Sequence, residues 1–169
     1  MPYDPRMIQP FRDELTQAGF TELHTAAEVD ASVAQKGTTM VIVNSVCGCA
    51  AGQARPGAML ALQNAKIPDR SVTVFAGVDR DAVNRAREHM SEYPPSSPCM
   101  GRFKDGKLVF MLQRLDLQQM NEDQVATALR EAFDQHCAGK GPSISAEEFQ
   151  KIRPYQGCGS GIPLLGQRA

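Results

Sequence analysis

The stretch Thr39-Met40-Val41-Ile42-Val43-Asn44-Ser45-Val46-Cys47-Gly48-Cys49-Ala50-Ala51 decides the fold of this chain. Its first half is largely apolar and rich in β-branched residues, which is typical of a buried strand. The alanines after the second cysteine favour the start of a helix. Two thiols separated by one glycine therefore stand where a strand passes into a helix. Because the N-terminal end of a helix stabilises a thiolate, the sequence predicts a redox site at this junction.

Other elements follow from apolar periodicity, capping residues and turn residues. The dipeptide Asp105-Gly106 is typical of a tight type I′ hairpin turn. Thr25 with Glu28, and Asn121 with Gln124, have the spacing of residues that begin helices. The sequence predicts helices over about 5–18, 26–35, 50–65, 79–90 and from 121 onward, and strands over 38–46, 71–76, 100–103 and 108–112.

The resulting order, β-α-β-α-β-β-α after a helical segment, is that of a thioredoxin-like α/β fold. Its first two strands are parallel and need a right-handed crossover, which the helix after Cys49 supplies. We expect a three-layer α/β/α sandwich around a central mixed four-stranded sheet. Residues 1–137 form the predicted domain, with residues 1–37 as an N-terminal helical extension.

Residues 138–169 have a different character. They contain six glycines and three prolines, so we expect a partly ordered C-terminal tail instead of a second domain. Ser145-Ala146-Glu147-Glu148 indicates one short helix that ends near Ile152.

Composition narrows the class of protein. The chain has 169 residues and a net charge of −1, which gives no reason to expect nucleic acid or an anionic membrane as a partner. No apolar stretch approaches the ~20 residues of a membrane helix, and the N-terminus lacks a secretory signal, so a cytoplasmic location is expected. Five cysteines, an odd number, argue against a framework of structural disulfides. A monomer or weak homodimer is the expected state.

The chemistry expected of the Cys47-Gly48-Cys49 motif is thiol-disulfide exchange. Cys47, next to the free N–H groups of the helix, is the predicted nucleophile, and Cys49 is the resolving thiol that attacks a mixed disulfide formed on Cys47. Such a dithiol needs no bound cofactor. The alternative interpretation is that both cysteines are inert core residues, but the glycine and the strand-to-helix junction favour the redox site.

The one-residue spacing has its own consequence. A disulfide between residues i and i+2 is hard to close without strain, although Gly48 eases the backbone. Since a strained disulfide is more easily reduced, we expect a protein better suited to isomerisation or mixed-disulfide removal than to strong reduction.

Ser97-Pro98-Cys99 is the second candidate element of the site. By chain order Pro98 matches the cis proline that lies beside the cysteines in thioredoxin-like proteins; the alternative is a trans proline in a turn. Ser97 would then offer backbone groups to an extended substrate. Cys99 is a possible accessory thiol or metal ligand, but a core-facing strand residue is the favoured interpretation.

Three further residues stay open at this point. Arg55 is a candidate for binding an anionic thiol substrate, although a solvated arginine is the simpler interpretation. Cys137 is expected to be structural. Cys158 is either a free thiol or a residue that reaches the site.

A rival hypothesis is a zinc or iron–sulfur protein that uses Cys47, Cys49 and Cys99 with a further thiolate, but a Cys-X-Cys pair alone is a weak metal signature. The predicted site therefore contains no metal. A binding module without turnover is a third alternative.

The block from Asn44 to Gly52, followed by Ala54-Arg55-Pro56, resembles the bacilliredoxin family of bacterial thioredoxin-like proteins. Three further blocks match in order: Val72-Thr73-Val74-Phe75-Ala76-Gly77, Pro95-Ser96-Ser97-Pro98 and Ala132-Phe133-Asp134-Gln135-His136-Cys137.

This resemblance covers about residues 5–137 and implies an oxidoreductase or disulfide isomerase that removes bacillithiol from proteins. By that analogy Cys47 attacks the mixed disulfide and Cys49 resolves it. The implied partners are S-thiolated client proteins, a low-molecular-weight thiol as co-substrate and a recycling reductase. The chain departs from the family pattern in its extension beyond Cys137 and in having Cys99 where a serine is expected.

Overall fold

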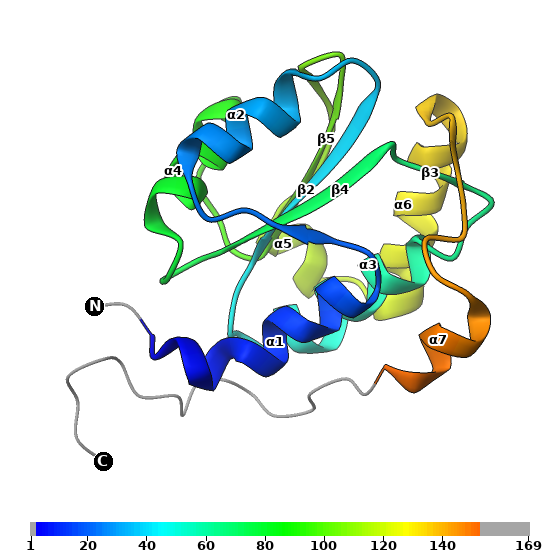
Figure 1. The fold of residues 1–169 in the computed structure, drawn as a ribbon, viewed down its shortest axis with the longest axis horizontal. Helices are drawn as coiled ribbons and strands as arrows, with labels where there is room; N and C mark the ends of the chain where they lie inside the picture. The colour runs from blue at the N-terminus through cyan, green and yellow to red at the C-terminus, as the bar shows by residue number, and fades with distance from the viewer. Residues whose placement is uncertain (1–2, 153–169) are drawn as a thin grey trace.

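The structure, a computed structural model, describes residues 3–152 and contains a mixed sheet with helices packed on both faces (Figure 1). The helical elements are α1 (Pro5–Gln17), α2 (Ala26–Ala34), η1 (Ala50–Ala54), α3 (Arg55–Ala61), α4 (Arg80–His89), α5 (Arg114–Gln118), α6 (Glu122–His136) and α7 (Ala146–Lys151). The strands are β1 (Thr21–Glu22), β2 (Thr38–Asn44), β3 (Lys66–Ile67), β4 (Arg70–Phe75), β5 (Cys99–Lys104), β6 (Lys107–Leu112) and β7 (Gly139–Lys140).

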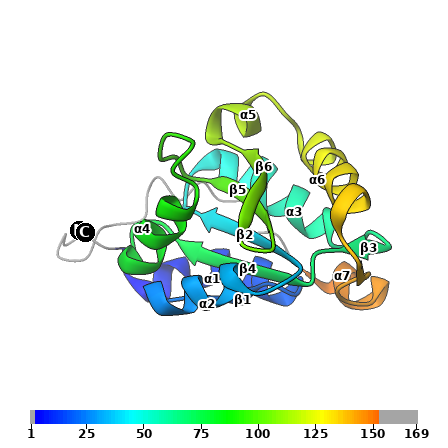
Figure 2. The same cartoon turned by 90° about the horizontal axis from the view of Figure 1, so that it is seen from above.

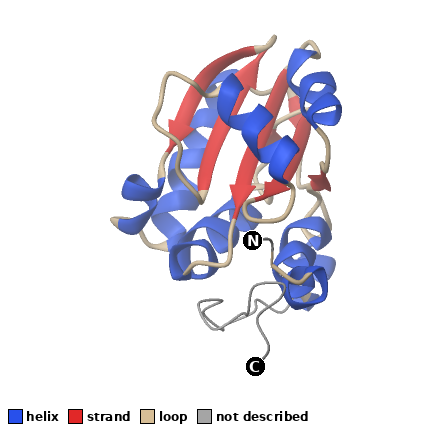
Figure 3. Cartoon of the chain, turned by 90° about the vertical axis from the view of Figure 1, so that its left-hand side faces the viewer, coloured by secondary structure: helices blue, strands red, loops and turns tan. Residues whose placement is uncertain are grey.

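Figure 3 shows the strands of the central sheet side by side, and their order is β1-β4-β2-β5-β6. β2 is parallel to β4 and antiparallel to β5, so the strand that leads to the two cysteines lies in the middle. The expected four-stranded sheet is thus incomplete: β1 adds a fifth strand, parallel to β4. Two residues are too few to produce a recognisable alternation, and only pairing with β4 defines this strand.

Two cores flank the sheet, as the three-layer prediction requires. Figures 1 and 2 show α2 and α4 over one face and α3 and α6 over the other. Side chains of β2 divide between them by strand alternation: Val41 and Val43 face the α2 and α4 side, whereas Met40 and Ile42 face the α3 and α6 side. The predicted thioredoxin-like α/β sandwich is therefore confirmed.

The segment before β2, expected to be a helical extension, is part of the central domain. α1 begins at Pro5, with Asp4 accepting a hydrogen bond from the N–H of Arg6, and continues past Pro10. β1 then joins the central sheet, and the capping box of Thr25 and Glu28 opens α2. A purely helical extension is thus wrong, because this segment supplies an edge strand as well.

The helix expected over 50–65, in which Gly52, Pro56 and Gly57 predict a kink, is divided into two elements in the structure. A five-residue π-helical turn, η1, precedes α3, which ends at Ala61. π-Helical turns of this kind are rare and occur often at functional sites. Gly57 permits close packing of α3 on α6, since a Cβ there would lie 2.5 Å from Cγ1 of Val125.

The C-terminal part of the described chain packs on the domain. β7 pairs with β3 in a small separate ribbon, and the side chain of Ile152 reaches the α3 and α6 core. α7 lies at the position of the expected short helix. In the hairpin, Asp105 and Gly106 both have positive φ, as the predicted type I′ turn requires.

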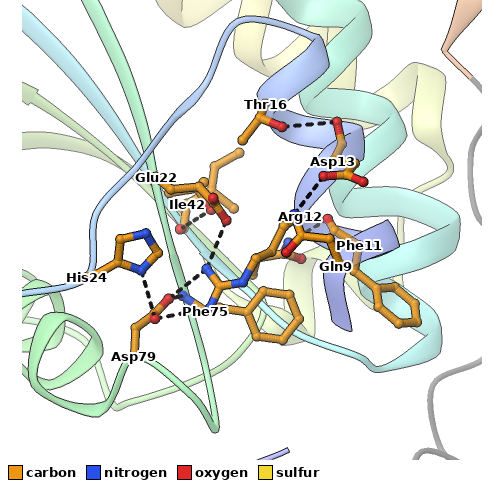
Figure 4. A network of polar contacts seen from close by, with 12 residues as sticks. Gln9, Phe11, Arg12, Asp13, Thr16, Glu22, His24, Ile42, Phe75 and Asp79 are labelled. Atoms are coloured by element: carbon orange, nitrogen blue, oxygen red, sulfur yellow. Dashed lines mark hydrogen bonds and ion pairs between the residues drawn. The ribbon is translucent and has the colours of Figure 1, made fainter. Parts of the chain in front are cut away.

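A buried charge network fixes α1 against the sheet and the start of α4 (Figure 4). Arg12 donates two hydrogen bonds of 3.0 Å to Asp79 and one of 2.8 Å to Glu22. Asp79 also accepts the backbone N–H of Phe75 and contacts the ring of His24. These contacts connect parts of the chain that are far apart in sequence, and no local pattern predicts them.

Asp79→Asn should lower the free energy of unfolding by about 2 kcal/mol at neutral pH, since hydrogen bonds to a buried charge are lost. Burial alone would raise the pKa of Asp79, but hydrogen bonds from Arg12 and His24 outweigh it and hold the pKa below 3.8. The contribution of ionised Asp79 to the free energy of unfolding is therefore complete at pH values above 3.8. It is lost as the pH falls through the lower pKa that Asp79 has in the folded state. Urea unfolding of both proteins from pH 7 to pH 3 tests this; a difference in stability that does not shrink on acidification would contradict it.

Among the described residues, no helix is long and apolar enough to cross a membrane.

Candidate active site

Cys47 and Cys49 lie at the carboxyl end of β2, where the central strand passes into the π-helical turn. Their Sγ atoms are 2.9 Å apart and are not joined in a disulfide. The carbonyl of Cys47 accepts the N–H groups of Ala50 and Ala51, so helical hydrogen bonding begins at this residue. Both side chains are partly exposed, and nothing within 4 Å would obstruct a Cβ on Gly48. The dithiol is thus accessible to a second molecule.

The two thiols are electrostatically unequal. Burial raises the pKa of Cys47, but hydrogen bonds from Cys49, Ser45 and the backbone of Ala50, with the charge of Arg114, lower it overall. Burial and the neighbouring Cys47 sulfur raise the pKa of Cys49 to about 11. When the pair loses its first proton, the thiolate therefore forms on Cys47, and Cys49 keeps its proton. This asymmetry is what the predicted nucleophile and resolving thiol require.

Ser45 and Asn44 organise the loop before the nucleophile. The hydroxyl of Ser45 lies 3.2 Å from Sγ of Cys47 and donates to it. The side chain of Asn44 spans the junction: its amide nitrogen donates to the carbonyl of Phe11, and its oxygen accepts the N–H of Ser45. The end of β2 is therefore held to α1 before the chain turns toward Cys47.

Arg55 corrects a sequence prediction. Its side chain is fully buried, so it is neither solvated nor available to a substrate. It forms an ion pair of 2.8 Å with Glu14 and donates to the carbonyl of Ser45 at 2.9 Å. It also lies over the ring of Phe11, 4.9 Å from its centroid. Arg55 is a positioning residue that fixes the backbone at Ser45, two residues before Cys47.

Ser97 lies in the wall of a cavity of about 320 Å³ that also contains Cys47. The Ser97–Pro98 peptide is cis, as predicted, and Pro98 is buried. The carbonyl of Ser97 lies 3.5 Å from Nη1 of Arg114. The two segments that the sequence singled out, far apart along the chain, therefore meet at one cavity.

Cys99 and Cys137 are not part of the wall of this cavity. Cys99 is 1% exposed and packs in the core beneath α2 and α4, where burial raises its pKa to about 11. This is the core-facing position that the sequence favoured, and it is poorly suited to an accessory redox thiol. Cys137 is buried near Arg102, and Cys158 lies outside the described residues. In residues 3–152 no three His, Cys, Asp or Glu side chains are grouped to hold a metal ion.

Sequence reasoning missed the two arginines of the cavity wall, Arg87 and Arg114. The sequence does contain an indication for Arg87. It lies four residues after Val83 and three before Met90, on the apolar face of an amphipathic helix, and a charged residue on such a face indicates a specific role. Arg114 follows the hairpin directly, and only the tertiary fold brings it beside Cys47.

Comparison with known proteins assigns the family. Residues 3–137 match the family model described as disulphide isomerase. A bacilliredoxin of Koribacter versatilis is 50% identical over 136 residues, covering 80% of this chain and 94% of that protein. The chain belongs to the bacilliredoxin family. A bacilliredoxin of Salinibacter ruber is 42% identical and covers 99% of this chain and 98% of its own length, so some bacilliredoxins share the extension beyond Cys137.

Solved structures agree on the fold. Mitochondrial thioredoxin 3 of Saccharomyces cerevisiae matches with a TM-score of 0.50 and 18% identity, covering 71% of this chain and 98% of the thioredoxin. Membership of the bacilliredoxin family together with this fold identifies the chain as a thiol-disulfide oxidoreductase. Thiol-containing client proteins and a reductant are the partners that such an activity implies.

The lowered pKa of Cys47 leads to a testable pH dependence in this bacilliredoxin-family protein. Alkylation of Cys47 by iodoacetamide should reach half of its maximal rate at a lower pH than alkylation of a free cysteine, because the thiolate is the reactive form. Ser45→Ala removes a donor to that thiolate, so the profile should move to higher pH and the rate at pH 7 should fall about three- to tenfold. Peptide mass spectrometry would follow the reaction, with the exposed Ser91→Ala as control. An unchanged profile in Ser45→Ala would contradict this assignment.

Proposed function

We propose that this protein releases a low-molecular-weight thiol from client proteins that carry it as a mixed disulfide, with bacillithiol as the expected thiol. The observation that carries the proposal is the unequal pair: a partly exposed Cys47 with a lowered pKa, 2.9 Å from a Cys49 whose pKa is raised. The names of its bacilliredoxin relatives support the choice of thiol.

The reaction has two steps. The Cys47 thiolate attacks the sulfur of the small thiol in the client's mixed disulfide, so that a Cys47–thiol disulfide forms and the client leaves as a thiolate that takes up a proton. Cys49 then loses its proton and attacks Sγ of Cys47, which forms the Cys47–Cys49 disulfide and expels the small thiol. After both steps this protein has lost two electrons and carries the Cys47–Cys49 disulfide. A dithiol reductase must reduce that disulfide before the next cycle.

The protonated state of Cys49 suits this order of events. While Cys47 is a thiolate, its charge raises the pKa of Cys49 and keeps the second thiol protonated. Once Cys47 is part of a neutral mixed disulfide, that charge is gone, and Cys49 ionises more easily. The dithiol carries all of the electrons, so we propose no resident cofactor.

Isomerisation of protein disulfides is a second activity of the same site. The family model is described by that activity, and the open position of the dithiol supports it. The strain expected of a disulfide between residues two apart favours both reactions over strong reduction, because a strained disulfide forms less readily.

Intact-mass analysis tests the proposal directly. The wild-type protein should remove bacillithiol from a client protein modified on one cysteine, with loss of the adduct mass from the client. The same client carrying glutathione, and a scrambled disulfide protein, serve as parallel substrates. Failure to remove bacillithiol, with efficient removal of glutathione, would overturn the choice of thiol. Failure on both adducts with rapid rearrangement of the scrambled protein would make isomerisation the main activity.

A further inference from the structure

The cavity beside Cys47 contains two cations and, among the described residues, no carboxylate in its wall. Its polar side chains include Arg87 from α4, Arg114 at the start of α5, and Ser97. We propose that Arg87 and Arg114 form an anion subsite that binds a carboxylate of the small thiol while that thiol is attached to Cys47. This inference rests on the proposed function and names the residues that select its substrate.

Arg87 has unused capacity to donate hydrogen bonds. It is half-buried, and its Nε is a buried atom without an acceptor in the part of the chain that the structure describes. Among those residues it has no ion pair, although neighbouring Arg85 and Glu88 on the same helix pair with one another. Arg87 also lines the cavity, so an anion that enters would find a guanidinium without a carboxylate partner among the described residues.

Arg114 lies in the same cavity wall as Cys47. Its backbone N–H lies 3.4 Å from the hydroxyl of Ser96, and its Nη1 lies 3.5 Å from the carbonyl of Ser97. Its charge acts on both Cys47 and Cys49, which places the guanidinium close to the dithiol. It too lacks a carboxylate partner within residues 3–152.

Formation of the mixed disulfide strengthens the case for an anion at this position. When Cys47 is ionised, its thiolate supplies a negative charge to the cavity wall that also contains these arginines. When Cys47 becomes part of a neutral disulfide, the cavity loses that charge and keeps both cations. A thiol with a carboxylate brings a negative charge back into the cavity. A guanidinium binds a carboxylate through paired, charge-assisted hydrogen bonds. An uncharged thiol brings no such charge.

The test measures which of two small thiols Cys47 prefers at equilibrium. The Cys49→Ser/Cys158→Ser protein is incubated with 3-mercaptopropionate, 2-mercaptoethanol and both of their symmetrical disulfides, and intact mass gives the ratio of the two adducts. N-acetylcysteine amide in the same solution corrects for the intrinsic difference between the thiols. We expect Cys47 to favour the carboxylate by about tenfold. Arg87→Gln or Arg114→Gln should reduce this ratio to about threefold, and the double variant should bring it close to one.

Lys107→Gln is the matched control, because it removes one positive charge at the hairpin turn, at the end of the sheet away from the cysteines. Its ratio should equal that of the parent protein. A loss of catalytic power cannot imitate the expected result, since a weaker Cys47 nucleophile would react less with both thiols and leave their ratio unchanged. High salt should lower the ratio in the parent protein and leave the double variant unaffected.

Three results would overturn the inference. Equal adducts in the parent protein would remove the anion subsite and leave the exchange reaction intact. No adduct with either thiol would refute the proposed function and this inference together. A preference for a peptide with aspartates beside its cysteine, without any preference for 3-mercaptopropionate, would show that the carboxylate belongs to the client protein instead of the small thiol.

Discussion

Cys47→Ser should abolish release of the small thiol from a mixed-disulfide client, with a rate at least about a thousandfold below that of the wild type. The expectation follows from the position of the thiolate: the pKa of Cys47 is lowered, whereas that of Cys49 is raised to about 11. Cys49→Ser should retain the first attack and accumulate the thiol as a stable adduct on Cys47. Acid-quenched intact-mass time courses of both variants measure these two outcomes.

Cys99→Ser and Cys137→Ser are the controls for this experiment, since both residues are buried away from the cavity. Each should release the thiol at close to the wild-type rate if the protein folds. Equal loss of activity in Cys47→Ser and Cys49→Ser, without a trapped adduct, would contradict the assignment of roles. An adduct on Cys49 of the Cys47→Ser protein at a comparable rate would contradict it as well.

Arg55→Met should lower the free energy of unfolding by about 3–5 kcal/mol, the usual cost of breaking a buried ion pair from one side. The guanidinium is fully buried, pairs with Glu14 at 2.8 Å and donates to the carbonyl of Ser45. Its removal takes a partner from a buried carboxylate and loosens the strand end that precedes Cys47. Urea unfolding measures the loss of stability, and the alkylation rate of Cys47 measures the effect on the site.

The double variant Glu14→Gln/Arg55→Met is the control for the ion pair. Because neither charge remains, it should recover part of the stability lost in Arg55→Met alone. A loss below about 1 kcal/mol in Arg55→Met would mean that the pair contributes no more than an exposed one. An additive loss in the double variant would show that the two side chains do not stabilise each other.

Local signals gave most of the secondary structure. The apolar run before Cys47 predicted β2, Asp105-Gly106 predicted the hairpin turn, and the capping pair of Asn121 and Gln124 predicted the start of α6. These signals work because each depends on residues within a few positions of one another. β1 and the β3–β7 ribbon gave no such signal, since two-residue strands exist only through their partners.

Arg55 and Arg87 show where sequence reasoning failed. Arg55 was the candidate for the substrate because of its charge and its position on the helix after Cys49. The structure places Arg55 under the site, paired with Glu14, and brings Arg87 into the cavity wall. Arg55 is buried because it pairs with Glu14 of α1, which is 41 residues away in sequence.

The sequence by itself determined the redox dithiol, its strand-to-helix junction, the thioredoxin-like order of elements and the position of the cis proline. The dithiol, its junction and the order of elements are encoded in short segments with their own conformational preferences, and the proline followed from its place in that order. Only the tertiary structure decided the fifth strand, the unequal pKa values of Cys47 and Cys49, and the pair of arginines at the cavity. The physical reason is that β1 exists only through its pairing with β4, and that the burial of the dithiol and the charges of Arg114 and Arg87 beside it arise only when the sheet is assembled.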